Sequence, residues 1–158
     1  AFAGAVGAFH RRNVSSDPRD KTFLGDCGSQ FVGLALASLA VVLARDARTD
    51  SVDFTAPVVL FLPFLFDTTL TLIRRLRRGA NVFEAHHEHL YQRHLDLGDS
   101  HEDVRRRWIP ILLWHFALAT IVVLAGSGSL LGRLALLASP APMLYYHGHV
   151  ARRESERT

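Results

Sequence analysis

APVVLFLPFLFDTTLTLI, residues 56–73, decides the fold: it is 18 residues long and carries one charged side chain, Asp67. An α-helix rises about 1.5 Å per residue, so about 20 apolar residues cross the hydrocarbon core of a bilayer. Residues 109–126 and 129–146 are apolar stretches of the same length. Residues 31–44, FVGLALASLAVVLA, are uncharged but number 14, and they approach spanning length only when the preceding turn is counted.

These blocks predict an all-α fold, a multi-pass integral membrane helical bundle. We expect about four full membrane helices plus the end of another, residues 1–9, in a single membrane domain that covers residues 1–158. The mean hydropathy of the chain is only +0.14, because it averages the spans with very polar loops. The single cysteine, Cys27, excludes an internal disulfide and a multi-cysteine zinc ribbon.

Charge placement predicts the orientation of the bundle. Lys and Arg accumulate on the cytoplasmic side of short loops, and most of the 18 in this chain fall in residues 10–22, in residues 74–108 and after residue 146. The inner loops 10–28 and 74–108 are therefore expected to face the cytoplasm. This topology, with attraction to anionic head groups, explains the net charge of +3. The charge thus indicates a lipid bilayer as partner and no nucleic acid.

The segment TFLGDCGSQF, residues 22–31, places the carboxylate of Asp26 between Gly25 and Gly28 at the edge of an apolar stretch. The simplest interpretation is a helix N-cap, with Gly28 and Ser29 as loop residues. The second is that a glycine-bounded carboxylate beside a helix N-terminus holds a hard divalent cation, while the adjacent backbone N–H groups bind phosphate oxygens. Both interpretations can hold together.

The inner loop 74–108 is rich in histidine, and six histidines lie between positions 86 and 115. Asn81 followed by Glu84 resembles a capping box, and Gly98 can end a helix. A helix is therefore expected over residues 82–97.

On that helix His86, His89 and Arg93, at i, i+3 and i+7, share one face. A solvated polar face explains each of them singly. A zinc-protease motif is excluded by its spacing, since Tyr91 stands where the second histidine is required. Guanidinium binds phosphate in bidentate fashion and imidazole exchanges a proton near neutral pH, so this face suits a diphosphate ligand.

Asp67 is a carboxylate within a span, where a charge is costly and by default suggests a function. Asp67, Thr71 and Arg74 are at i, i+4 and i+7, so the acid can pair with a cation of the inner loop. The alternative is an internal ion pair that only orients this helix.

Three segments, in order, resemble the polyprenyl-phosphate N-acetylhexosamine-1-phosphate transferases of glycosyltransferase family 4. FLGDCGS, residues 23–29, is similar to the signature F-[ML]-G-D-x-G-S of that family. PFLFDTTLTLIRR, residues 63–75, and the histidine loop that follows it resemble the next two landmarks.

The segment HLYQRHLDLGDSH keeps the register of the family pattern H-x-H-H-x-x-x-x-x-G-x-S at His89, Gly98 and Ser100. Tyr91 and Gln92 replace the second and third histidines. This form is similar to a branch associated with O-antigen and capsule assembly. The replacement weakens any role carried over to those two positions, but not the role of His89.

The resemblance implies a multi-pass enzyme of about ten membrane helices in the bacterial cytoplasmic (inner) membrane, with its active site facing the cytoplasm. Such an enzyme transfers N-acetylhexosamine-1-phosphate from a UDP-N-acetylhexosamine to undecaprenyl phosphate and releases UMP, with Mg²⁺ or Mn²⁺ as cofactor. This is the first lipid-linked step of cell-wall, lipopolysaccharide O-antigen or capsule assembly. The oligomeric state stays open between a monomer and a homodimer.

By the same resemblance, Asp26 is expected to be a catalytic metal ligand and His89 a catalytic residue. The expected substrate-binding residues are His86, Arg93, Asn13, Gly28 and Ser29. The interpretation requires Asp26 and His89 to meet at one inner membrane surface, on a metal-bound diphosphate.

The upstream acidic motif of the family, a pair of aspartates, is absent, since no Asp-Asp occurs in the chain. Together with first residues that read as a helix in progress, this predicts the C-terminal fragment of a longer transferase, inactive alone. Two other classes stay open. One is a non-enzymatic, His-rich metal-binding membrane module for transport or sensing. The other is a lipid-linked phosphatase, which would need no nucleotide pocket.

Overall fold

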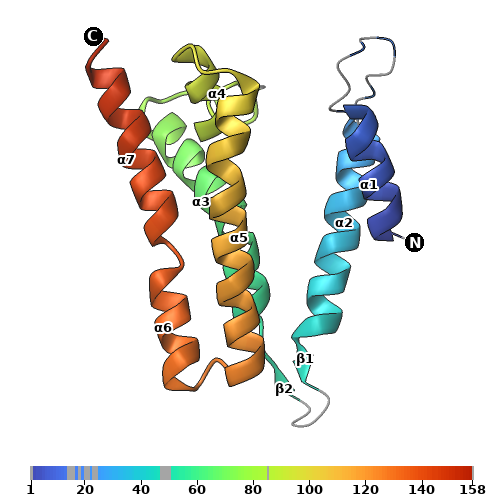
Figure 1. Ribbon diagram of the computed structural model, residues 1–158. Helices are drawn as coiled ribbons and strands as arrows, with labels where there is room; N and C mark the ends of the chain where they lie inside the picture. Colours follow the sequence, from blue (N-terminus) through green and yellow to red (C-terminus); the bar gives the residue numbers. More distant parts are fainter. Residues whose placement is uncertain are drawn as a thin grey trace. The chain divides into compact units, whose positions relative to one another are not determined.

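The structure is a computed structural model that describes residues 2–13, 17, 19, 22, 25–46, 51–84 and 86–157. The chain divides into two compact units, Ala1–Leu43 and Ala44–Thr158, both drawn in Figure 1. Helices make up almost all of the regular structure, so the predicted all-α class is confirmed.

The first unit contains α1 (Phe2–Asn13) and α2 (Gly25–Ala44). The apolar stretch predicted at residues 31–44 does extend through its preceding turn, because α2 has 20 residues. Its apolar side chains are largely exposed, among them Phe31 at 65% and Val42 at 70%. A helix that is apolar on most sides and not covered by protein is typical of a lipid-facing segment.

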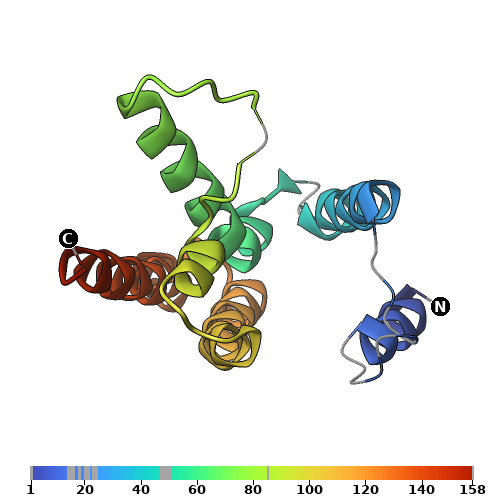
Figure 2. The ribbon, with the colours of Figure 1, turned by 90° about the horizontal axis from the view of Figure 1, so that it is seen from above.

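The second unit is a bundle built on two long helices, α3 (Thr55–Arg77) and α5 (His101–Ala125), which lie side by side (Figures 1 and 2). With 23 and 25 residues, both are long and apolar enough to cross a membrane. α6 (Leu130–Ala138) packs against α5, and α7 (Ala141–Ser155) follows it. Two of the predicted spans are therefore confirmed as helices.

The connection into α3 is a short antiparallel pair, β1 (Arg45–Asp46) and β2 (Ser51–Val52). Asp53 Oδ1 then accepts a hydrogen bond from Thr55 N at 2.8 Å and so satisfies a free donor at the start of the helix.

The span predicted over residues 129–146 is divided. Ser139 and Pro140 separate α6 from α7, and Pro140 is the N-cap of α7. Proline lacks a backbone N–H and its ring clashes with the preceding turn, which explains the break in this span. Among the described helices, two reach the length and hydropathy of a membrane span, fewer than the four expected.

The turn between α5 and α6 is a tight hairpin that begins at Gly126. Gly126 has a φ of 81°, which side chains rarely allow. Ser129 caps α6 by accepting a hydrogen bond from Gly132 N at 3.0 Å. A Cβ on Gly132 would lie 2.2 Å from the carbonyl oxygen of Gly126. The hairpin can therefore close this tightly only because Gly132 has no side chain.

Replacing Gly132 by alanine should lower the free energy of unfolding of the bundle by about 1–3 kcal/mol, since the atoms it meets are backbone and cannot move aside cheaply. Gly128→Ala is the matched control, because a Cβ there has nothing within 4 Å. Thermal unfolding of both variants in the same detergent measures the difference. Equal midpoints would contradict the close approach.

Two apolar clusters fill the second unit. One joins α4 (Leu90–Asp96) to α5 and α7, and its buried members are Leu90, Leu97, Ile111, Met143, Tyr146 and Val150. The other holds α3, α5 and α6 together through Val59, Leu118, Ala119, Val122 and Ala135. Outside these clusters large apolar side chains are exposed, among them Leu124 at 82% and Leu137 at 74%. Such an apolar exterior is what a bundle in lipid requires.

The helix predicted over residues 82–97 is wrong in its first half. α4 begins later, with His89 rather than Asn81 as its N-cap, and the capping box is formed with Gln92. The end of the helix is as expected, because Gly98 follows it with a φ of 84°. Figure 2 shows α4 seated among the ends of α3, α5 and α7.

Contacts with α3 explain the difference. Arg75 Nη1 donates to Glu88 Oε1 at 2.6 Å, and Arg78 pairs with the same carboxylate. Arg75 also donates to the carbonyl oxygen of Asn81. These bonds hold the two ends of residues 81–88 against the end of α3. This tertiary interaction overrides the local capping signal.

Candidate active site

Asp67 is a buried carboxylate on α3, and it meets the histidine loop. Its Oδ1 accepts a hydrogen bond from Leu90 N at 2.8 Å, and its Oδ2 lies 3.3 Å from His89 Nδ1. The hydroxyl of Thr71 lies 3.5 Å from the same carboxylate. The partner of this acid in the loop is the imidazole of His89, and not Arg74, which the i, i+7 spacing offered. Asp67 thus fixes both the start of α4 and the histidine that caps it.

The imidazole of His89 is oriented by its neighbours. Nδ1 faces Asp67, the ring is stacked on Tyr91 at a centroid distance of 6.2 Å, and it lies 5.1 Å from the ring of His86. The side chain remains 28% exposed. A carboxylate at one ring nitrogen fixes the tautomer and the ring orientation, so Nε2 is the nitrogen left for a ligand.

A pocket of about 390 Å³ opens beside this pair, where α3, the start of α4 and α5 meet. Its lining residues are Phe64, Asp67, Thr68, His89, Tyr91, Val104 and Trp108. The wall is mostly apolar and aromatic, and it contains one polar pair, which is the usual make-up of a ligand site. The pocket suits an amphiphilic ligand, with a polar group at His89 and hydrocarbon against the rings.

Arg93 faces a different part of the bundle. It is buried, its Nε donates to Glu154 Oε1 at 2.7 Å, and its Nη2 bonds to the other carboxylate oxygen. Glu154 belongs to α7, so the pair ties α4 to α7. The structure therefore brings His86 and His89 together, but it holds Arg93 in an ion pair that the sequence did not indicate.

The predicted substrate-binding residues of the first unit make local contacts. Asn13 Nδ2 donates to the carbonyl oxygen of Thr22 at 3.2 Å. Ser29 Oγ donates to the carbonyl oxygen of Gly25 at 2.9 Å, and Gly28 lies in the first turn of α2. Gly28 and Ser29 thus lie near the start of α2, and Asn13 is the last residue of α1.

Asp26 is the second residue of α2, so the helix begins earlier than an N-cap at Asp26 requires. A carboxylate in the first turn is still favoured by the helix dipole. The side chain of Asp26 lies outside the described part of the chain. Asp26 belongs to the first unit and His89 to the second, and each unit is described by itself, so their meeting on a metal-bound diphosphate stays a prediction.

The fit of a divalent cation depends on the number of oxygen ligands. Mg²⁺ keeps several waters and is commonly bound by one or two carboxylates together with substrate phosphates. Within the residues that the structure describes, no three His, Cys, Asp or Glu side chains are grouped to hold a metal ion. Asp26 would supply one oxygen ligand, which fits an ion bound otherwise by phosphates.

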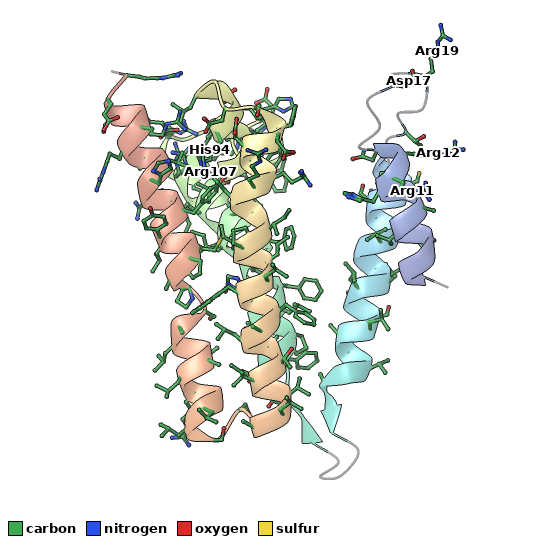
Figure 3. The ribbon with its side chains drawn as sticks, viewed as in Figure 1. Arg11, Arg12, Asp17, Arg19, His94 and Arg107 are labelled. Atoms are coloured by element: carbon green, nitrogen blue, oxygen red, sulfur yellow. The ribbon has the colours of Figure 1, made fainter. Side chains whose placement is uncertain are left out.

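A second polar cluster, which the sequence did not reveal, lies where α4, α7 and the first turns of α5 meet. We call it the Asp99 cluster; its members are His94, Asp99, Arg107 and Arg153. Asp99 Oδ2 accepts hydrogen bonds from Arg107, at 2.6 Å, and from Arg153, and the fully buried His94 lies against the same oxygen. Figure 3 shows His94 beside Arg107. The cluster fastens α4, α5 and α7 together, and nothing in the sequence marks Arg153, 54 residues from Asp99.

The charges of the Asp99 cluster follow from burial and hydrogen bonding. Burial raises the pKa of Asp99, but the hydrogen bonds, first that from Arg153, outweigh it and hold the pKa far below the usual range. Burial lowers the pKa of His94, and it prevails over the opposite effect of Asp99. At neutral pH the cluster therefore contains an ionised carboxylate, two guanidiniums and a neutral imidazole.

The chain is similar to curated proteins that share the name decaprenyl-phosphate N-acetylglucosaminephosphotransferase. That of Mycobacterium tuberculosis (strain ATCC 25618 / H37Rv) is 36% identical over 124 residues, 72% of this chain and 29% of that protein. That of Mycobacterium leprae (strain TN) is 37% identical over 107 residues, 61% of this chain and 26% of that protein. That of Mycolicibacterium smegmatis (strain ATCC 700084 / mc(2)155) is 32% identical over 123 residues, 72% of this chain and 29% of that protein. The chain spans less than a third of the length of these relatives, and no family model and no solved structure matches it.

Proposed function

We propose that this chain, a homologue of part of the polyprenyl-phosphate sugar-1-phosphate transferases, belongs to a membrane enzyme that moves N-acetylhexosamine-1-phosphate from a UDP-sugar to a polyprenyl phosphate. The observation that carries the proposal is the 36% identity over 72% of the chain. The pocket beside His89 supports it, because it joins a polar pair to an apolar wall at the end of two long apolar helices.

The relatives are named for decaprenyl phosphate and N-acetylglucosamine phosphate. We therefore take UDP-N-acetylglucosamine as the first donor to test, with decaprenyl and undecaprenyl phosphate as the acceptors. The enzyme would work at the cytoplasmic face of the bacterial inner membrane and begin a lipid-linked glycan of the cell wall. Basic loop residues favour this orientation.

In the reaction, an oxygen of the lipid phosphate forms a bond to the β-phosphorus of the UDP-sugar. The bond from that phosphorus to the bridging oxygen breaks, and UMP leaves with the electron pair. Negative charge gathers on the bridging oxygen, so the enzyme has to place hydrogen-bond donors and cations there. His89, held by Asp67 at Nδ1, would in its protonated form donate from Nε2 to a phosphate oxygen. The aromatic wall of the pocket would receive the first part of the isoprenoid chain.

Asp26 would hold Mg²⁺ or Mn²⁺, whose charge, when bound, draws the diphosphate oxygens together and offsets their repulsion. The free backbone N–H groups at the start of α2 belong to residues 25–27, where a helix N-terminus favours phosphate, and Gly28 and Ser29 follow them directly. Asn13 is the proposed contact to the nucleotide.

The proposal is tested with the purified full-length protein in detergent with polyprenyl phosphate. We expect UMP release from UDP-N-acetylglucosamine that requires the lipid phosphate, stops in EDTA and returns with Mg²⁺. Parallel assays with decaprenyl and undecaprenyl phosphate determine the preferred acceptor. UMP release that is independent of lipid would contradict the proposal, and so would phosphate release from the lipid without any UDP-sugar, which indicates a phosphatase. The 158-residue chain is the matched control and is expected to be inactive alone.

A further inference from the structure

Four ionisable side chains from three helices meet on a side of the bundle that the proposed reaction does not use: Arg74 of α3, Arg93 of α4, and His147 and Glu154 of α7. Arg93 and Glu154 form the ion pair described above. The other two lie within electrostatic range of that pair and of each other. None of the four lines the pocket beside His89.

Two nitrogens of this group are buried and, among the described residues, lack a hydrogen-bond partner. Within the described residues, Arg74 Nη1 and His147 Nδ1 make no hydrogen bond, although water does not reach either atom. Most buried polar atoms in proteins are paired, and an unpaired one is costly. Two such atoms on two helices beside the same ion pair indicate one missing acceptor rather than two separate defects.

The charges of the group point to an anion. Both oxygens of Glu154 are engaged by the fork of Arg93. Two guanidiniums thus face one carboxylate, and Arg74 has no counter-ion in direct contact among the described residues. An acceptor with several oxygens and negative charge satisfies Arg74 Nη1, the Nδ1–H tautomer of His147 and the free charge.

We propose that Arg74 and His147, backed by Arg93, form a binding site for a phosphate-type anion between α3, α4 and α7, separate from the pocket beside His89. The shared chemistry is a tetrahedral phosphate group. It can come from free phosphate or from the head group of an anionic lipid, because α3 ends at the predicted inner surface of the membrane.

The full-length protein in nanodiscs of phosphatidylcholine, at constant ionic strength, is the system for the test. Inorganic phosphate is titrated against chloride, and the unfolding midpoint is followed, because a ligand that binds the native state raises it. A second arm replaces part of the phosphatidylcholine by phosphatidylglycerol. A rise with inorganic phosphate identifies a site open to the free ion, and a rise only with phosphatidylglycerol identifies a head-group site.

Arg74→Gln is expected to lower the affinity for the ligand that raises the wild-type midpoint at least tenfold, because charge-assisted hydrogen bonds are lost. Arg77→Gln is the matched control, since Arg77 is an exposed arginine in the same last turn of α3. His147→Gln is the second variant and should weaken binding in the same arm. The proposal is overturned if neither ligand raises the midpoint of the wild type, or if all variants respond as the wild type does.

Discussion

In the proposed reaction, replacing His89 by alanine is expected to lower the rate of UMP release by the full-length protein about 100- to 1,000-fold. This is the usual loss when one hydrogen-bond donor or proton-transfer group is removed from a phosphate or acyl site. The structure gives a reason to expect the upper part of that range. The ring is held by Asp67 and Tyr91 and lines the pocket, so it is already oriented for this role. The loss should appear mainly in kcat, because the donor acts on developing charge.

The matched control is His101→Ala. His101 is an exposed histidine of the same loop, at the first position of α5, and it does not line the pocket. It should leave UMP release within a few-fold of the wild type. Equal losses in the two variants would mean that the histidine loop acts through its general charge, and would remove His89 from the proposed chemistry.

Replacing Asp99 by asparagine is expected to lower the free energy of unfolding at pH 7 by about 1–2 kcal/mol, because it leaves two partly exposed guanidiniums without their carboxylate. The side chain of Asp99 is 13% exposed, whereas those of Arg107 and Arg153 are 37% and 28% exposed, so solvent screens part of their charge. The variant should unfold at a clearly lower temperature than the wild type in the same detergent.

The pH dependence of unfolding supplies a second readout for the same variant. The pKa of Asp99 is lower in the folded chain than in the unfolded one. Its contribution is therefore present in full above about pH 5 and is lost progressively as the pH falls below the usual range of a carboxyl. Stability should fall more steeply with acid in the wild type than in Asp99→Asn. Asp96→Asn, an exposed carboxylate of α4, is the control and should behave as the wild type does.

Hydropathy and turn chemistry in the sequence predicted much of the fold. The apolar stretches became α2, α3 and α5, and Pro140 divided the next one. Gly98 ended a helix, as its free φ allows. These signals are local, since each depends on a few neighbouring residues and on the length that a bilayer requires. These predictions are correct because no contact with a distant part of the chain opposes the local preference.

The errors come from contacts over long distances in the chain. The capping signal at Asn81 gave way to the ion pairs of Glu88 with α3. Arg93 was expected to serve the ligand, and the structure pairs it with Glu154, 61 residues later. Asp67 was recognised as unusual from its place in a span, whereas its partner followed only from the structure. No periodicity within one helix can reveal which side chain of another helix will reach it.

Because contacts from α7 hold α4 in place, α4 can reach its final position only after α7 has been synthesised. The segment that carries His89 leaves the ribosome well before Arg153 and Glu154, to which its neighbours Asp99 and Arg93 bind. Until α7 has been translated and has packed against the bundle, Asp99 and Arg93 lack these hydrogen-bond partners. Nascent chains halted before α7 should therefore keep this loop open to protease, and ligand sites near His89 should mature only late in translation.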